Sequence, residues 1–367
     1  MEKAKKFIAL LLTLAFVAAM ISCGKNQEQG HIHKIGVLVY DLKDEQVQAF
    51  REYLEGYIAA SFSDVDFLYS SEVTTEEKEM EFLNNAIAEG VEGVLAFNSF
   101  DLEKEVSLCA ENGVYFIRPS STTAPEDFDK VADNPYFLGY FGPGSEMEYQ
   151  AGYDMGSYFA KEQISDSYFL LSGGAGANVM HEQRAEGMLD ALQEAYGVQF
   201  EQSSAELASA SEPVSVEAEG LKVTIFPGYI SALEVGQQAI AEFEKDPAGV
   251  VMSTIPVLPI ASSLGDASLG TVDCYTESNG ELFKNGNLKY LCGKYESIIG
   301  PAFAAMYNAV TGYSEDFRED GKAFAIQQGF WTSTNYQDFQ KKYELSSGIT
   351  LNAYSYEDLL DVCKAHN

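Results

Sequence analysis

The sequence predicts an α/β fold of two doubly wound lobes. Short apolar runs rich in β-branched residues alternate with segments whose apolar residues recur at helical spacing, which is the pattern of parallel strands connected by helices. The length of 367 residues suits two domains, since one domain takes about 150 residues. Hydrophobic residues make up 46% of the chain and charged residues 22%, which excludes a disordered or collagen-like chain.

The N-terminal segment predicts a lipoprotein signal peptide over residues 1–22. Three lysines precede an apolar run over residues 7–21, which is shorter than the roughly 20 residues that a transmembrane helix needs and suits a signal peptide. Met20-Ile21-Ser22-Cys23 then resembles the lipobox of bacterial lipoproteins, whose cysteine is diacylated on sulfur and becomes the new N-terminus. We therefore expect a lipid on Cys23. A plain secretory signal with an incidental cysteine is the alternative.

Residues 23–33 predict a tether between the lipid and the first lobe. His31 and His33 stand at its end, and we expect them to lie on the surface rather than to bind a metal. The cysteines after Cys23 show no CxxC or CxxH spacing, so zinc is not expected there either. No cofactor is predicted.

The first lobe is predicted from residues 34–135, and the family resemblance described below implies that a later segment at about 295–325 completes it. One helix begins at Thr74-x-x-Glu77, a capping box, and another ends at Asn112-Gly113, a C-terminal stop. The strands are short apolar runs of the kind that parallel sheets bury on both faces. They are expected at 34–40, 65–69, 93–97 and 114–117, with helices at about 47–58, 74–87 and 101–112.

The second lobe is predicted from residues 136–294, and the same resemblance implies that about 326–367 complete it. Its first strand is expected at 136–140, and the capping box Ser145-x-x-Glu148 opens the next helix. Residues 202–220 are rich in Ser, Ala and Glu, and predict an acidic surface insertion. In the rest of the chain we expect strands at 168–171, 223–226, 249–253, 270–275, 288–292 and 324–332, and helices at about 179–196, 233–243, 297–310 and 356–365.

The charge of the chain narrows the functions that it can have. With 56 acidic and 23 basic residues the formal net charge is −33, a field that repels nucleic acids and anionic membranes. The loop Gly173-Gly174-Ala175-Gly176 precedes a helix in the manner of a phosphate cradle, but Val179 stands where GxGxxG needs glycine. The sequence contains no P-loop, GxSxG or HExxH motif. We expect neither an enzyme nor a nucleic-acid partner.

The order of these elements resembles the type I periplasmic binding proteins, the ribose-binding-like receptors of bacterial ABC importers. The resemblance covers roughly residues 34–343, and it rests on 35–41, 93–98, the Arg-x-Glu-Gly within 176–187, 285–288 and 327–331. It implies that the chain crosses three times between the lobes, that the crossings act as a hinge, and that a ligand closes the cleft. It also implies a monomer that passes a sugar or a related small molecule to an ABC permease in the membrane.

Ligands of open α/β sheets bind beyond the carboxyl ends of strands, and the resemblance places this chain's contacts there. Arg118 lacks the aspartate that usually accompanies it in the family, and Ile255 stands where the family often has asparagine. Basic residues stand out among the candidates, so an acidic or otherwise modified ligand is a second hypothesis beside a plain sugar. The ligand-binding residues implied are Tyr40, Asp41, Asn98, Arg118, Arg184, Tyr275, Glu277 and Lys294.

Several of these residues also have a purely structural interpretation. Tyr40 suits a core aromatic as well as a ring that stacks on a sugar. Asp41 suits a helix N-cap. In so acidic a protein, Arg118 and Arg184 suit ion pairs with surface carboxylates. Asn98 both donates and accepts hydrogen bonds, which favours contact with a hydroxylated ligand.

Together these features predict a lipid-anchored, extracytoplasmic solute-binding protein that captures a small polar ligand between its lobes for an ABC importer. Two alternatives share the fold. One is a ligand-sensing receptor that signals to a membrane kinase, and the other is a nucleoside-binding lipoprotein. A transcription repressor is disfavoured, because the lipobox stands where the DNA-binding head would be.

Overall fold

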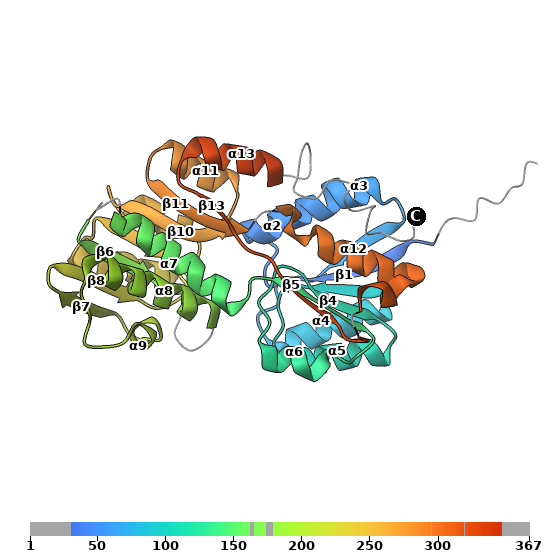
Figure 1. Cartoon of the computed structure of the whole chain (residues 1–367). Helices are drawn as coiled ribbons and strands as arrows, with labels where there is room; N and C mark the ends of the chain where they lie inside the picture. Colours follow the sequence, from blue (N-terminus) through green and yellow to red (C-terminus); the bar gives the residue numbers. More distant parts are fainter. Residues whose placement is uncertain (1–30, 162–164, 174–178, 295, 319, 347–367) are drawn as a thin grey trace, which may run out of the picture.

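The computed structural model describes residues 31–161, 165–173, 179–294, 296–318 and 320–346 (Figure 1). The expected signal peptide, the lipid-attachment residue Cys23, residues 23–30 of the tether and the expected helix at 356–365 lie outside the described residues. Among the helices that the structure describes, none is both long and apolar enough to span a membrane.

The N-terminal lobe is built on a parallel sheet. Within the described residues the strand order is β12 (Phe324–Gln327), β5 (Phe137–Gly142), β4 (Tyr115–Arg118), β3 (Gly93–Ala96), β1 (His33–Leu38) and β2 (Val65–Tyr69). One face is covered by α4 (Glu76–Ala88), α5 (Leu102–Glu111) and α6 (Pro125–Val131). The other face is covered by α2 (Glu45–Glu52), a π-helical turn (Tyr53–Ile58), α3 (Ala59–Ser61) and α12 (Gly300–Asn308) (Figure 1). Coverage on both faces explains why the strands are almost entirely apolar.

The helices of this lobe begin where the sequence supplies capping side chains. Asp44 accepts hydrogen bonds from two backbone amides in the first turn of α2, at 2.9 and 3.1 Å. Thr75 and Asp101 cap α4 and α5 in the same way, so the N-cap of α4 is Thr75 and not Thr74, the residue that the capping-box pattern predicts. The N-cap of α2 is therefore Asp44, and the N-cap interpretation of Asp41 is wrong.

The C-terminal lobe is built on a mixed sheet. Its strand order, within the described residues, is β13 (Trp331–Ser333), β11 (Leu288–Lys294), β10 (Ser268–Cys274), β9 (Val250–Ser253), β6 (Ser167–Leu171), β8 (Leu221–Phe226) and β7 (Val214–Ala218). Strands β13 and β7 pair antiparallel at the two edges. One face carries α7 (Ser145–Lys161), α8 (Val179–Tyr196) and α9 (Ser204–Ala208). The other carries α10 (Leu233–Lys245), α11 (Glu277–Lys284) and α13 (Tyr336–Ser346).

Strand pairing changes two expectations about the lobes. The strand expected to open the second lobe is β5, and it pairs with β4 and β12 in the N-terminal sheet. This moves the first boundary from residue 136 to a point after Gly142. The segment 202–220, expected as a surface insertion, contains α9 and the edge strand β7, because Val214 and Val216 pack against the C-terminal core.

The described residues cross between the two sheets at three places (Figure 1). The chain passes from β5 to α7, from β11 towards α12, and from β12 to β13. The single strand expected at 324–332 is thus two short strands, one in each sheet. Chain segments that connect two lobes are the places where a hinge motion takes place.

Helices α7 and α8 pack closely because glycines face their contact. A Cβ on Gly152 in α7 would lie 1.9 Å from the carbonyl oxygen of Arg184 in α8. A Cβ on Gly187 in α8 would lie 2.2 Å from the carbonyl oxygen of Tyr149 in α7. This close approach brings the side chains of Glu148 and Arg184 together.

Candidate ligand-binding site

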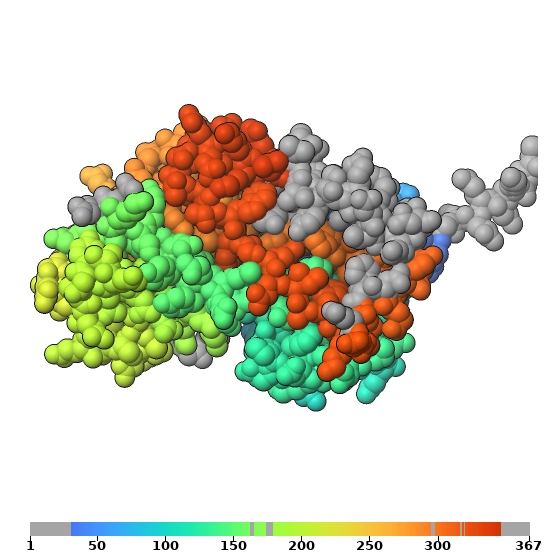
Figure 2. Space-filling model, in the orientation of Figure 1, coloured from blue at the N-terminus to red at the C-terminus, as the bar shows by residue number. Residues whose placement is uncertain are grey.

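Loops at the carboxyl ends of strands in the N-terminal lobe contact the C-terminal lobe, and a notch is visible in the surface between the two lobes (Figure 2). Lys294, at the end of β11, donates a hydrogen bond from Nζ to the carbonyl oxygen of Ser120, at 2.7 Å. Thr122 Oγ1 donates to Glu148 Oε1 at 3.1 Å. Ser120 and Thr122 lie in the loop after β4, so this loop joins the N-terminal lobe to the C-terminal lobe.

Arg184 lies at the centre of this contact. Its Nε donates to Glu148 Oε2 at 2.5 Å, and its Nη1 donates to the carbonyl oxygen of Thr254 at 2.7 Å. Its guanidinium lies 5.6 Å from the ring centre of Phe330. The side chains of Arg184 and Glu148 are 7% and 0% exposed. The partner of Arg184 is therefore a buried carboxylate. The structural interpretation from the sequence instead expects an ion pair with a carboxylate on the surface.

Several buried polar atoms at these strand ends and in the first turn of α8 have no hydrogen-bond partner among the described residues. They are Asn98 Oδ1, Arg118 Nε and Ser120 Oγ in the N-terminal lobe, and His181 Nδ1 and Thr254 Oγ1 in the C-terminal lobe. Leaving a buried polar group unsatisfied costs about 1–3 kcal/mol. Because both lobes contribute donors and acceptors, the arrangement suits a small molecule with many hydroxyl groups.

His181 occupies the C-terminal side of this site. Burial, followed by the charge of Arg184, lowers the pKa of His181 to about 3, so its imidazole is neutral. A neutral imidazole donates from one nitrogen and accepts at the other. Its ring meets that of Tyr229 edge to face, with centroids 5.5 Å apart. Gly173 allows this packing, since a Cβ there would lie 3.1 Å from the His181 ring and 2.9 Å from Thr254 Oγ1.

Asn98 occupies the N-terminal side, directly beyond β3. Its Nδ2 donates to Glu79 Oε1 at 2.9 Å. Glu79 and Glu105 have no exposed surface. Both accept a hydrogen bond from the backbone amide of Phe100, at 2.9 and 3.1 Å. Burial, followed by the adjacent Glu105, raises the pKa of Glu79 to about 9. This carboxyl pair therefore holds a proton at neutral pH, and it fixes the amide of Asn98.

The three cations expected from the sequence are opposed by carboxylates of the protein. Arg118 Nη1 donates a hydrogen bond to Thr123 Oγ1 at 3.1 Å. Burial lowers the pKa of Arg118, and the nearby carboxylates of Glu105 and Glu79 act in the opposite direction. Burial lowers the pKa of Lys294 to about 8, although Glu148 acts in the other direction. Glu148 faces both Arg184 and Lys294, and the Glu79–Glu105 pair that faces Arg118 carries one negative charge, so the positive charge of the three cations is compensated only in part.

Tyr275, which the resemblance implies as a ligand contact, is a core residue in this structure. The residue is fully buried, and its hydroxyl lies 3.0 Å from Ser333 Oγ. Its ring stacks on that of Phe339 in α13, with centroids 5.3 Å apart. Although Tyr275 follows β10, its side chain turns into the apolar layer beneath α13 rather than towards the other lobe.

Tyr40, Asp41 and Glu277 lie at a second place between the lobes. Tyr40 is 39% exposed, so it is not a core residue. Asp41 accepts a hydrogen bond from a backbone amide two residues ahead, at 2.9 Å, and Glu277 is exposed in the first turn of α11. Ser278 Oγ donates to Glu45 Oε1 at 3.0 Å, which links α11 to α2. No hydrogen bond found among the described residues joins these three residues to Arg184.

Four residues of the site do not follow from the sequence: Ser120, Thr122, Glu148 and Thr254. Glu148 has the spacing of a capping box, and its buried pairing with Arg184 spans 36 positions. Ser120 has a backbone φ of 54°, in the left-handed region, which a sequence pattern does not reveal for a serine. His181 stands beside the glycine-rich loop in the sequence, and that position is the one signal that pointed to it.

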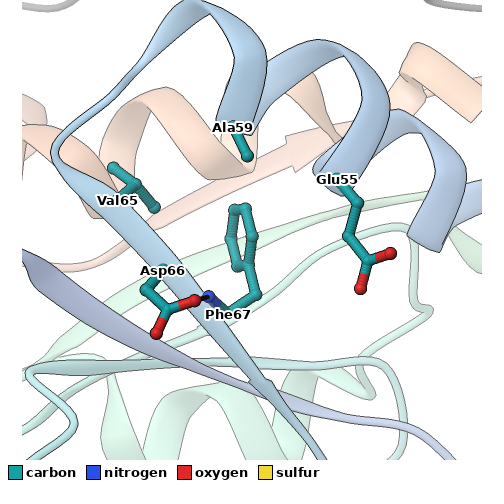
Figure 3. A pocket seen from close by; sticks show the side chains of 5 residues that line it. All are labelled: Glu55, Ala59, Val65, Asp66 and Phe67. Atoms are coloured by element: carbon teal, nitrogen blue, oxygen red, sulfur yellow. Dashed lines mark hydrogen bonds between the residues drawn. The ribbon is translucent and has the colours of Figure 1, made fainter.

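Two cavities lie away from this site, along the edge strand β2. One of about 560 Å³ lies between β2 and α4. The other, of about 220 Å³, has the Phe67 ring projecting into it (Figure 3). Both are lined by the N-terminal lobe alone, so neither offers contacts from both lobes. The smaller cavity is lined by Glu55, Ala59, Val65, Asp66 and Phe67.

Comparison with known proteins gives structural matches only. No family model and no curated protein sequence matches the chain. A galactofuranose-binding protein superposes with a TM-score of 0.63 at 10% identity, over 86% of this chain and 99% of that one. This chain has the type I periplasmic-binding-protein fold.

Two further type I binding proteins match over similar lengths. The periplasmic binding protein of the arabinose ABC transporter from Shewanella sp. ANA-3, bound to L-arabinofuranose, gives a TM-score of 0.60 at 14% identity, over 85% and 94% of the two chains. An ABC transporter solute-binding protein from Bacillus halodurans C-125 with bound myo-inositol gives 0.60 at 15% identity, over 87% and 99%. The fold implied by the resemblance is thereby confirmed.

Proposed function

We propose that this protein is a lipid-anchored, extracytoplasmic solute-binding protein that captures a sugar or sugar-like molecule between its lobes and delivers it to an ABC permease. The observation that supports it most is the set of unsatisfied polar atoms contributed by both lobes at facing strand ends. The type I fold supports it further, because the named neighbours bind galactofuranose, arabinofuranose and myo-inositol.

In this mechanism binding is coupled to closure of the lobes. Asn98 and Arg118 hold hydroxyl groups from the N-terminal side, while His181 and Thr254 hold them from the C-terminal side. Because the ligand contacts both lobes, it stabilises the closed form over the open one. The contacts of Lys294 with Ser120 and of Thr122 with Glu148 already join the lobes at this place. The permease then recognises the closed surface, and ATP is spent by a separate subunit.

A thermal-shift screen tests the ligand class. Pyranoses, furanoses, polyols, sugar acids and nucleosides are added to the purified protein, and a sugar or polyol is expected to raise the melting temperature by mass action. With that ligand, Asn98→Ala should weaken binding by about 10-fold to 100-fold, because a buried hydrogen bond of about 1–3 kcal/mol is lost. Asn84→Ala, at an exposed position of α4, should leave the affinity unchanged. A response to nucleosides alone, or to no member of the panel, contradicts the proposal.

The lipid anchor is tested by cell fractionation. Cys23→Ser removes the sulfur that would carry the lipid, so the protein is expected to move from the membrane fraction to the soluble fraction. Cys109→Ser changes a buried thiol in α5 and leaves the lipobox intact, so that variant should stay with the membrane. Retention of the Cys23→Ser variant in the membrane fraction would rule out the lipid on this residue.

A further inference from the structure

Three side chains with metal-binding atoms meet at the amino ends of the N-terminal sheet, at the edge opposite the interlobe site. His31 Nε2 lies 2.7 Å from Glu92 Oε1, and His33 Nδ1 lies 3.0 Å from Glu92 Oε2. Their ligand atoms all lie within 4.8 Å of one another. We propose that His31, His33 and Glu92 form a divalent-metal site that takes Zn²⁺.

The fold holds two of these three residues by their backbones. His33 opens β1, and its amide donates to the carbonyl oxygen of Asp64 at 2.7 Å. Glu92 directly precedes β3, and its amide donates to the carbonyl oxygen of Lys34 at 2.8 Å. The His33 ring is further positioned by an edge-to-face contact with Tyr307, with centroids 6.2 Å apart. Ligands that are already in place reduce the entropy lost when a metal binds.

His31 supplies the third ligand from the end of the tether. Its side chain is 68% exposed, and its ring meets that of His33 edge to face, with centroids 4.7 Å apart. The sequence brings His31 and His33 together, but Glu92 is 59 residues beyond His33 and reaches them only through the pairing of β1 with β3. A metal bound here would therefore tie the tether to the first lobe.

The donor set determines which metal fits. Two imidazole nitrogens and one carboxylate oxygen suit Zn²⁺, which takes nitrogen, sulfur and oxygen ligands in a tetrahedron, and water would complete the fourth position on the exposed side. Ca²⁺ prefers six to eight oxygen ligands, and Mg²⁺ an octahedron of oxygens. The site is thus expected to bind Zn²⁺ and Co²⁺, and to bind Ca²⁺ and Mg²⁺ poorly. This selectivity separates it from adventitious binding to a protein with a formal net charge of −33.

Isothermal titration calorimetry with Zn²⁺ tests the proposal on purified protein that carries no polyhistidine tag and has been stripped with a chelator. One Zn²⁺ per chain is expected to bind in the presence of excess Ca²⁺ and Mg²⁺. Co²⁺ should give the strong visible absorption of a tetrahedral complex. Hydrogen exchange should show residues 31–33 more protected when Zn²⁺ is present, because the metal ties them to Glu92.

Variants assign the binding to these residues. His31→Ala, at an exposed position that does not threaten the fold, should weaken Zn²⁺ binding by at least about 10-fold, as should His33→Ala and Glu92→Gln. Glu89→Gln removes an exposed carboxylate of the same surface and should leave the affinity unchanged. The proposal is overturned if Ca²⁺ displaces the Zn²⁺, if His31→Ala binds as tightly as the unmodified protein, or if no one-site binding is seen.

Discussion

Arg184→Ala is expected to lower the free energy of unfolding by about 3–5 kcal/mol, because it leaves the carboxylate of Glu148 buried without its partner. Glu148 has no exposed surface, and Arg184 is the cation that its Oε2 contacts at 2.5 Å. The carbonyl oxygen of Thr254 loses its hydrogen bond in the same variant. Chemical denaturation, monitored by the single tryptophan or by circular dichroism, measures the loss.

Two further variants separate this explanation from simple loss of packing. Arg184→Ala combined with Glu148→Ala removes both charges, and is expected to be more stable than Arg184→Ala alone. Arg51→Ala breaks the Arg51–Glu55 pair, whose side chains are 44% and 47% exposed, and should cost no more than about 1 kcal/mol. Equal losses for Arg184→Ala and Arg51→Ala would show that burial of Glu148 is not the cause.

The second large effect is a pH dependence that Glu79→Gln removes. The pKa of Glu79 is raised from 4.5 to about 9 by burial and by Glu105. Across this interval the folded state binds more protons than the unfolded state, so stability falls as pH rises from about 4.5 towards 9. One extra proton bound by the folded state gives the free energy of unfolding a slope of up to about 1.4 kcal/mol per pH unit. Glutamine stays neutral at every pH, so the variant lacks this slope.

The comparison is made between denaturation series from pH 5 to pH 9. Glu77→Gln lies on the same helix at an exposed position, and its slope should match that of the unmodified protein. Identical slopes for Glu77→Gln and Glu79→Gln would show that the carboxyl pair holds no extra proton.

The order of strands and helices could be predicted from the sequence, because each element carries its own local pattern. The runs at 93–97 and 114–117 end where β3 and β4 end, within a residue or so, and this places Asn98 and Arg118 at the carboxyl edge of the sheet. Since ligands of parallel α/β sheets bind at that edge, these two positions followed without knowledge of the tertiary structure.

Which of the two sheets a strand joins could not be predicted from the sequence in this way. A strand followed by a helix has the same pattern whichever lobe it joins, so the run at 136–140 looked like the start of a second lobe. Its place in the N-terminal sheet depends on hydrogen bonds with β4 and β12, and β12 lies more than 180 residues further along the chain. The burial of Tyr275 has a similar origin, because it depends on α13 closing over the ring.

By itself, then, the sequence determined the α/β class, the element order, and the polar residues that stand at strand ends, since each of these is encoded by near neighbours in the chain. The tertiary structure alone decided which polar residues meet. It paired Arg184 with Glu148, placed a protonated Glu79 beneath Asn98, and brought Glu92 to His31 and His33. Charges and hydrogen-bond donors act over a few ångströms, and such distances between remote residues exist only once the strands have paired and the helices have packed.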